Sequence, residues 1–354
     1  MLECPHMKKD DAKAALGRVL TWPAEAQKEA MPSADASQNR DDGTIIDDRP
    51  CTMLPLTYSD AMKGAKKIHE AESEFARKLG LAPLSFEQTD QPSEAEWNDM
   101  RAHEGFECRF IRYKSRGLVI DGFLYKPATT GDKRLPVVIL NRGGNRNFGA
   151  WVTWTFVQTA YAFGKAGFVV LASQYRGGGG SQGQDEFGGA DVDDVLSLVS
   201  ATKTLGYADP DNIFMFGISR GGMMTYLSIR RSAPIRAAAV LSGAADLAQN
   251  VKDRPEMREL FSQLIPGFTG HEAQSYRDRS AVMWAEEINV PVLLMHGTAD
   301  CRVSATDALQ LAQELERHNK TYQLMMFAND AHGLPAQRSV VERASIAWFR
   351  RFMR

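Results

Sequence analysis

Two short segments of this chain place a serine between two glycines, a spacing that suits acyl transfer by a serine nucleophile. Residues 217–221 read GISRG and residues 179–183 read GGSQG, so both match the pattern G-x-S-x-G. In such a turn the glycines leave room for neighbouring backbone, and the serine oxygen attacks a carbonyl carbon once a base removes its proton. The candidate nucleophiles are therefore Ser219 and Ser181, and their surroundings must separate them.

The flanking sequence favours Ser219. The apolar run IFMF precedes its pattern directly, and MMTYLSIRR, residues 223–231, follows with apolar side chains at helical spacing. A sharp turn between a strand and a helix strains the serine backbone and lifts its hydroxyl above the sheet. Around Ser181 the segments QYRGGG and QGQDEFGG occupy the places of the strand and the helix, which predicts a glycine-rich loop there.

A nucleophilic serine needs a base and an acid that orients the base, and both are expected after it in the chain. Asp300 follows the apolar run VPVLLM, and His332 lies in the loop after the run YQLMMF. Both therefore stand at the carboxyl ends of predicted strands, and the predicted triad is Ser219, Asp300 and His332. Asp246 is the alternative acid, and His296 is interpreted as a residue of a structural turn.

The tetrahedral intermediate also needs hydrogen-bond donors for its oxyanion. The backbone N–H of Arg220, directly after the serine, is one expected donor. The second should come from the loop NRGGN, residues 141–145, in which Gly143 and Gly144 allow backbone to approach the substrate closely. The Arg142 side chain could add a charged donor or could pair with a surface carboxylate, and the sequence leaves both hypotheses open.

Short apolar runs rich in β-branched residues alternate with helical segments through the rest of the chain. The runs are PVVIL, FVVLA, NIFMFG, AAAVL, VPVLLM and YQLMMF, and helices are expected over residues 151–165, 191–205, 222–231, 306–318 and 338–350. This alternation predicts an α/β fold with a mostly parallel sheet and helices on both faces. FECRFIRY and LVIDGFLY, within residues 106–125, predict an antiparallel hairpin at the sheet edge.

The sequence divides into an N-terminal extension, residues 1–105, and a catalytic domain, residues 106–354. The first 50 residues or so are polar and charged without periodicity, which predicts a disordered tail. Residues 59–79 carry apolar side chains at helical spacing. They predict one amphipathic helix, which we interpret as a helix packed on the main domain rather than a lid or a partner-binding helix.

Composition restricts the class of protein. Of the 354 residues, 44% are hydrophobic and 24% are charged, and the formal net charge is −2, which gives no electrostatic reason for a nucleic-acid partner. No apolar run reaches the ~18 residues of a membrane span, and the first residues lack a signal-peptide pattern. The four cysteines, Cys4, Cys51, Cys108 and Cys301, are widely spaced, so we expect free thiols in a reducing cytoplasm.

Two other classes of function remain as remote alternatives. Residues 178–183 match the dinucleotide-binding pattern G-x-G-x-x-G, but they come late after the strand and open no helix, which disfavours an oxidoreductase. A non-catalytic binding module would not need a serine, an acid and a histidine in this order. The sequence implies no metal and no cofactor.

Several segments together carry a family resemblance. GISRGGMMTYL, HGTADCRV, DAHG, QYRGGGGSQG and DGFLYKP resemble the catalytic domain of the prolyl oligopeptidase family of serine hydrolases, over about residues 106–354. The resemblance implies an α/β-hydrolase fold with Ser219, Asp300 and His332 as its triad. The chain departs from the family in two ways. A β-propeller with ~40 to 50 residues per blade does not fit into the first 105 residues, and Arg142 stands where prolyl oligopeptidases have an oxyanion-binding tyrosine.

The sequence therefore predicts a serine hydrolase acting on small esters or short peptides, with esters expected to react faster than aminoacyl anilides. The alternative is a true serine peptidase of the same family. Trp151 and Trp154 are interpreted as helix core rather than as the lining of a substrate pocket. Residues 244–287, between two strands, are long enough to form a cap over the site.

Overall fold

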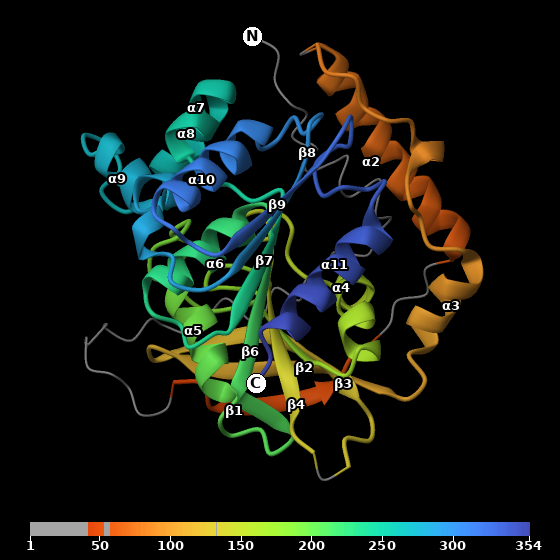
Figure 1. Cartoon of the computed structure of the whole chain (residues 1–354). Coiled ribbons are helices and arrows are strands. Elements are labelled where there is room, and N and C mark those ends of the chain that lie inside the picture. Colours follow the sequence, from red (N-terminus) through yellow and green to blue (C-terminus); the bar gives the residue numbers. More distant parts are fainter. Residues whose placement is uncertain (1–41, 53–56, 79, 132) are drawn as a thin grey trace.

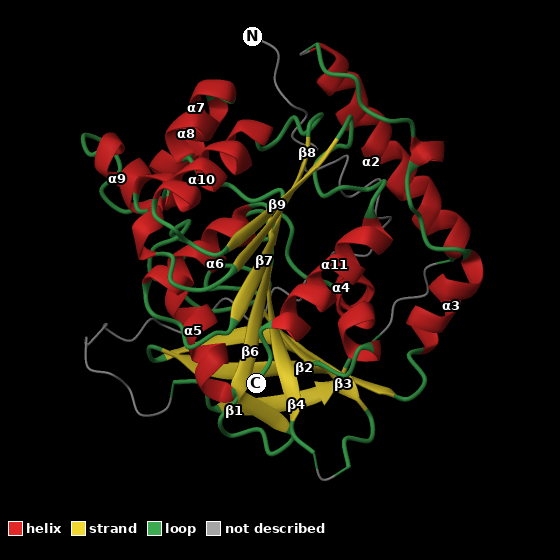
Figure 2. Cartoon of the chain, in the orientation of Figure 1, coloured by secondary structure: helices red, strands yellow, loops and turns green. Residues whose placement is uncertain are grey.

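A nine-stranded sheet forms the centre of the computed structural model, which describes residues 42–52, 57–78, 80–131 and 133–354 (Figures 1 and 2). Its strand order is β1-β2-β3-β5-β4-β6-β7-β8-β9. The strands are β1 (Ile45–Pro50), β2 (Phe106–Ser115), β3 (Leu118–Pro127), β4 (Leu135–Asn141), β5 (Val169–Ser173), β6 (Ala208–Ile218), β7 (Ala237–Leu241), β8 (Val292–Gly297) and β9 (Tyr322–Phe327). β1 to β3 are antiparallel and the six strands from β5 to β9 in this order are parallel, which confirms the predicted α/β fold.

Helices cover both faces of the sheet, as predicted. They are α4 (Thr153–Lys165), α5 (Asp191–Ala201), α6 (Arg220–Arg230), α10 (Ala305–Arg317) and α11 (Arg338–Arg351). α5, α6 and α10 contribute Val195, Met223 and Leu311 to one apolar cluster, while α4 and α11 contribute Phe163 and Phe349 to the cluster on the other face (Figure 1). Because both faces are buried, the parallel strands are apolar almost throughout, and every residue of β5 and β7 is buried.

The predicted hairpin is present, but it does not form the edge of the sheet. β2 and β3 pair over their whole length, and β1 pairs with the outer side of β2. The prediction of a disordered tail up to about residue 50 is therefore wrong for β1, whose mostly polar and exposed residues fit a strand at the edge of a sheet. The remainder of that predicted tail, residues 1–41, lies outside the described residues.

The next segment forms a pair of helices. α2 (Tyr58–Lys78) agrees with the predicted amphipathic helix, and α3 (Glu94–Ala102) is a second helix that the sequence analysis did not predict. Trp97 of α3 packs against Trp154 of α4 with 5.1 Å between the ring centroids. We call residues 58–103, apart from residue 79, the N-terminal helical unit, and Figure 1 shows it along the side of the molecule that carries α4 and α11.

The segment between β7 and β8 is a small helical insertion. It contains α7 (Leu247–Asp253), α8 (Glu256–Leu264), α9 (Glu272–Arg279) and two short 3-10 helices, Ala281–Met283 and Ala285–Glu287. Phe261 of α8 packs against Phe187 of the glycine-rich loop with 5.0 Å between the centroids. Arg279 of α9 donates through Nε to the carbonyl oxygen of Phe187 at 2.8 Å. The predicted cap segment is thus tied to the glycine-rich loop.

The cysteines differ from the prediction. Cys51 and Cys108 form a disulfide with 5.3 Å between their Cα atoms, so the expectation of free thiols is wrong for this pair. Sequence spacing could not show the pairing, because it depends on β1 joining β2 57 residues further along the chain. Cys301 is a buried thiol, and Cys4 lies outside the described residues. Among the described helices, none is long and apolar enough to cross a membrane.

Candidate active site

Ser219 occupies a sharp turn between β6 and α6. Its backbone has φ 58° and ψ −124°, a conformation that side chains with a β-carbon rarely adopt. The turn is held from β7, because Ser219 donates its backbone N–H to Leu241 and accepts at its carbonyl from Ala244. These hydrogen bonds hold Ser219 in its strained conformation. Strain of this kind persists at functional sites where the surrounding structure fixes the residue.

The glycines of the same turn are required by close contacts. A β-carbon at Gly221 would lie 1.9 Å from the carbonyl oxygen of Asn141 at the end of β4. A β-carbon at Gly217 would lie 2.4 Å from the carbonyl oxygen of Gly221. Both distances are far below van der Waals contact, so α6 approaches the sheet this closely only with glycine at these positions.

The predicted acid and base are in direct contact. His332 Nδ1 lies 2.8 Å from Asp300 Oδ2, and the Asp300 side chain is fully buried while that of His332 keeps 12% exposed. A carboxylate accepts only, so His332 carries a proton on Nδ1, and Nε2 is the ring nitrogen that remains to act as a base. Next to His332, Gly333 donates its N–H to Ser242 Oγ, one residue after the partner of the Ser219 N–H. The histidine loop and the serine turn therefore meet at the end of β7.

Asp300 is held in its ionised form. Burial alone would raise the pKa of its carboxyl group, but the charge of His332 and hydrogen bonds from His296 and His332 place that pKa well below its usual range. Its other oxygen, Oδ1, accepts backbone N–H bonds from Arg302 at 2.9 Å and Val303 at 3.0 Å. A charged, immobile carboxylate against Nδ1 is what a catalytic histidine needs to stabilise its protonated form.

The alternative acid and the rival serine have other contacts. Asp246 caps the N-terminus of α7, where Oδ1 accepts from the backbone N–H groups of Ala248 and Gln249. Ser181 accepts from the backbone N–H of Asp121 on β3 and lies in a loop that reaches its first helix only at Asp191. The structure thus brings Asp300, not Asp246, to His332, and builds the strained turn at Ser219 rather than at Ser181.

Two residues whose backbone N–H groups the sequence analysis proposed as oxyanion donors lie beside Ser219. Arg220 is the first residue of α6, where a backbone N–H has no acceptor within the helix. Gly143 contacts the serine, since a β-carbon at Gly143 would lie 3.1 Å from Ser219 Cβ and 3.6 Å from its Oγ. The absence of that β-carbon lets the loop after β4 lie against the serine.

The Arg142 side chain has a different role from either predicted one. The guanidinium is fully buried, and its five N–H groups donate to backbone carbonyls of the loops around it. The acceptors are Gln174 from Nε at 3.0 Å and Nη2 at 2.7 Å, Gly143 and Phe148 from Nη1 at 3.1 and 3.2 Å, and Arg146 from Nη2 at 2.7 Å. With no N–H left over, the guanidinium is not placed to bind an oxyanion. Burial and the nearby Arg220 charge lower the pKa of Arg142 to about 10.

Arg220 contributes a side chain that the sequence analysis considered only for its backbone. Its buried guanidinium pairs with Asp185 through two bonds of 2.7 and 2.8 Å and also with Asp191. Nη1 further donates to the carbonyl oxygen of Gly144 at 3.0 Å. Arg220 therefore joins the glycine-rich loop to the oxyanion loop beneath the serine. Aspartates in a loop give no sequence signal for this pairing, because the contacts span 29 and 35 residues.

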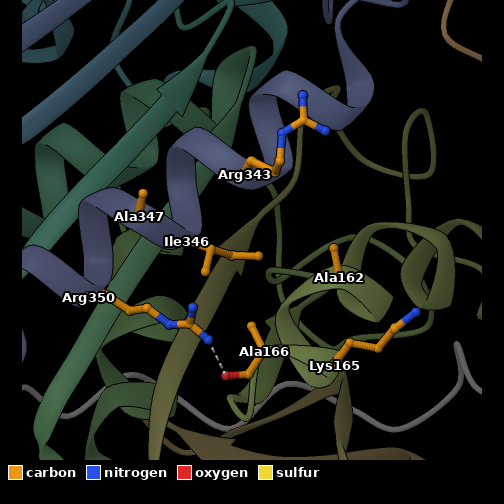
Figure 3. Close-up of a pocket in the computed structure, with 7 residues that line it drawn as sticks. All are labelled: Ala162, Lys165, Ala166, Arg343, Ile346, Ala347 and Arg350. Atoms are coloured by element: carbon orange, nitrogen blue, oxygen red, sulfur yellow. Dashed lines mark hydrogen bonds between the residues drawn. The ribbon is translucent and has the colours of Figure 1, made fainter.

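A separate groove of about 620 Å³ lies away from these residues, between α4 and α11. Figure 3 shows Lys165, Arg343 and Arg350 at its sides and Ile346 between the two helices. Arg350 donates to the carbonyl oxygen of Ala166 at 3.2 Å. None of its lining residues belongs to the predicted catalytic set.

The sheet order, the strained serine after a central parallel strand, and the acid and histidine after later strands define an α/β-hydrolase fold. The model of the prolyl oligopeptidase family matches residues 154–354, more than half of the chain. The chain belongs to the prolyl oligopeptidase family and is a serine hydrolase.

Relatives and solved structures agree with this family. The chain is 29% identical over 226 residues to the uncharacterized peptidase YtmA of Bacillus subtilis (strain 168), covering 64% of this chain and 86% of that protein. It is 23% identical to the human acylamino-acid-releasing enzyme, covering 88% of this chain and 47% of the enzyme. The acylaminoacyl peptidase of Pyrococcus horikoshii has the same fold, with a TM-score of 0.62 and 22% identity over 74% of this chain and 44% of that one. The chain thus spans less than half of the two acylaminoacyl relatives.

Proposed function

We propose that this chain hydrolyses amide bonds of short peptides or acylaminoacyl compounds, with Ser219 as nucleophile, His332 as general base and Asp300 as the acid that orients it. The observation that carries the proposal is the 2.8 Å contact between His332 Nδ1 and Asp300 Oδ2, beside a serine in a strained turn. The mechanism follows from this arrangement.

In the first step Ser219 Oγ attacks the carbonyl carbon and its proton passes to His332 Nε2. In this proposal the backbone N–H groups of Arg220 and Gly143, which lie beside Ser219, stabilise the oxyanion. The C–N bond then breaks, the leaving amine takes the proton from His332, and an acyl-enzyme remains. Water gives a proton to His332 and attacks the acyl-enzyme carbonyl carbon. The ester bond to Ser219 Oγ then breaks, His332 returns the proton to Oγ, and the carboxylate product leaves.

The substrate class comes from the relatives. Sequence reasoning favoured small esters, whereas the matched proteins include an uncharacterized peptidase and an acylamino-acid-releasing enzyme, which support the peptidase alternative. Ester cleavage remains part of the proposal, because an ester leaving group needs less help from a protonated histidine than an amine does.

Active-site labelling tests the assignment. A fluorophosphonate probe should modify Ser219, and Ser219→Ala should abolish both labelling and hydrolysis. Ser181→Ala is the matched control in the same G-x-S-x-G pattern, and it should still be labelled. Labelling that survives Ser219→Ala would refute the nucleophile assignment.

A substrate panel tests the chemical class. It should contain aminoacyl anilides with free and acetylated amino groups, together with aryl esters of the same acids. We expect hydrolysis of at least one anilide, with kcat/KM measured for each member. If only esters are hydrolysed and no anilide is cleaved above background, the result would contradict the proposed amide hydrolysis and favour a function on small esters.

A further inference from the structure

A second histidine, His296, contacts the same carboxylate as His332. It lies near the end of β8, is 1% exposed, and places Nε2 3.2 Å from Asp300 Oδ2 and 3.0 Å from the carbonyl oxygen of Val303. Both neighbours of Nε2 are acceptors, so Nε2 carries a proton and donates it between the two oxygens. His296 thus belongs to the set of groups that determine where the Asp300 side chain lies.

The donors around Asp300 are divided equally between its oxygens. Oδ1 accepts from the backbone of Arg302 and Val303, and Oδ2 accepts from the two histidines. Rotation of the carboxylate would therefore break bonds at both oxygens. His296 also contacts the turn that follows Asp300. Val303 donates its backbone N–H to Asp300 Oδ1, and its carbonyl oxygen accepts from His296 Nε2.

His296 also affects the charge state of Asp300. It lies among Asp300, Asp307 and His332, in a region closed to solvent. Burial would lower the pKa of His296, but its hydrogen bond to Asp300 and the charge of that carboxylate raise it, with a further contribution from Asp307. A donor or a positive charge at this position stabilises the ionised form of Asp300 and so lowers the pKa of that carboxyl group.

Resting on the proposed function, we infer that His296 is a positioning residue for catalysis: its Nε2–H holds Asp300 Oδ2 in line with His332 Nδ1. His296 acts through Asp300 and does not contact substrate. Without it, Oδ2 has a single donor, and the Asp300 side chain can turn away from the histidine.

Two substitutions separate the donor from the ring. In His296→Gln the amide nitrogen reaches about as far as Nε2 and keeps the donation, whereas His296→Leu has similar volume and no donor. The readout is the inactivation by a fluorophosphonate, resolved into a maximal rate and a probe affinity, which needs His332 as general base but no known substrate. His318→Leu, at the end of α10, is the control for loss of a histidine elsewhere.

The expected result is a fall of ~10-fold or more in the maximal inactivation rate of His296→Leu with little change in probe affinity. His296→Gln should stay within ~3-fold of the original protein, because it keeps the donated hydrogen bond. Should the leucine variant fail to fold, His296→Asn gives the same comparison, because its shorter amide does not reach Asp300.

Two results would overturn the inference. One is a His296→Leu protein whose maximal inactivation rate is unchanged. The other is a glutamine variant as impaired as the leucine variant, which would show that the donated hydrogen bond is not the relevant property. Both differ from failure of the proposed function, in which labelling would not depend on Ser219 at all.

Discussion

Asp300 and Asp246 show how the same residue type takes different roles after neighbouring parallel strands. Asp246 accepts two N–H groups of α7 and stabilises a helix end, whereas Asp300 faces a histidine ring from a fully buried position. Position at a strand end is therefore not enough to assign the catalytic acid. The partner of each carboxylate decides it.

Neutralising these two carboxylates should separate their roles. Asp300→Asn should lower kcat by roughly 10³-fold or more, because an amide no longer stabilises the imidazolium or selects its tautomer. Asp246→Asn keeps an oxygen that caps α7 and should change kcat by less than ~3-fold. Steady-state kinetics on whichever anilide or ester the panel selects measures both. A large loss for Asp246→Asn beside a nearly silent Asp300→Asn would reverse the assignment.

Arg142 is expected to act on stability more than on chemistry. Arg142→Met removes donors from four buried or partly buried backbone carbonyls, and each carbonyl left without a partner costs about 1–3 kcal/mol. We expect the free energy of unfolding to fall by about 3 kcal/mol or more in urea titrations. Arg146→Met, on the exposed part of the same loop, is the control and should change it by less than about 0.5 kcal/mol. Equal stability of the two variants would contradict this role.

At the scale of elements, the N-terminal helical unit contacts both loops that carry the acid and the base. The backbone N–H of Leu84 donates to Asn329 and that of Asp90 donates to Pro335, three residues before and three residues after His332. On the other loop, Glu72 of α2 pairs with Arg302, two residues after Asp300. The unit lies outside the residues matched by the family model, yet it supports the catalytic loops.

The ion pair between Glu72 of α2 and Arg302 allows a test of whether α2 supports the Asp300 loop. Glu72→Gln should reduce kcat by ~3- to 10-fold with a smaller change in KM, because the Asp300 loop loses one of its external contacts. Glu74→Gln, two residues along the same helix, removes an exposed pair with Lys78 and should leave kcat unchanged. Indistinguishable kinetics for the two variants would mean that α2 only packs on the domain.

The insertion is joined to α10 through a buried carboxylate with a shifted pKa. Asp307 Oδ2 accepts from the backbone of Ala245 and Asp246 and from Asn250 Nδ2. Burial raises the pKa of Asp307 to about 7, although these backbone bonds and nearby His296 act in the opposite direction. Because the folded protein binds this proton more tightly than the unfolded chain, stability should decrease as pH rises from about 4 to 7.

Asp307→Asn isolates that contribution, since its amide does not titrate. The free energy of unfolding, measured in urea at several values between pH 5 and 8, should depend less steeply on pH in the variant than in the original protein. Parallel curves for the two proteins would show that Asp307 is not the titrating group.

At the scale of the whole molecule, the sequence was sufficient for most features that depend on local order, although it missed helix α3. Parallel strands and helices follow from apolar periodicity, and Ser219 and His332 follow from their place after such strands. Glycine at 217 and 221 marked the turn through its spacing around the serine, although the contact that requires Gly221 is made with Asn141 at the end of β4. Spacing along the chain was enough to find these features.

The remaining features depend on contacts between distant segments. The role of Arg142 requires carbonyls from a loop 32 residues away, and the edge strand requires residues 45–50 to meet β2. His296 was interpreted as a turn residue because its hydrogen bond to Asp300 is a matter of geometry that its spacing does not show. Polar residues with long-range partners are therefore where sequence reasoning fell short.

The disulfide connects the edge of the sheet to its interior and should affect the stability of the whole domain. Cys51 and Cys108 are 57 residues apart, and a cross-link of that span removes about 4 kcal/mol of chain entropy from the unfolded state. Unfolding in urea with a reductant should therefore occur at a lower midpoint than without one, and Cys51→Ser with Cys108→Ser should unfold alike under both conditions. Peptide mapping without reduction should yield one cross-linked pair that contains these two cysteines. The opposite outcome has two parts: both cysteines are recovered in unlinked peptides from protein made under oxidising conditions, and the urea midpoint is unchanged by reductant. It would show that Cys51 and Cys108 are free thiols, as the sequence predicted.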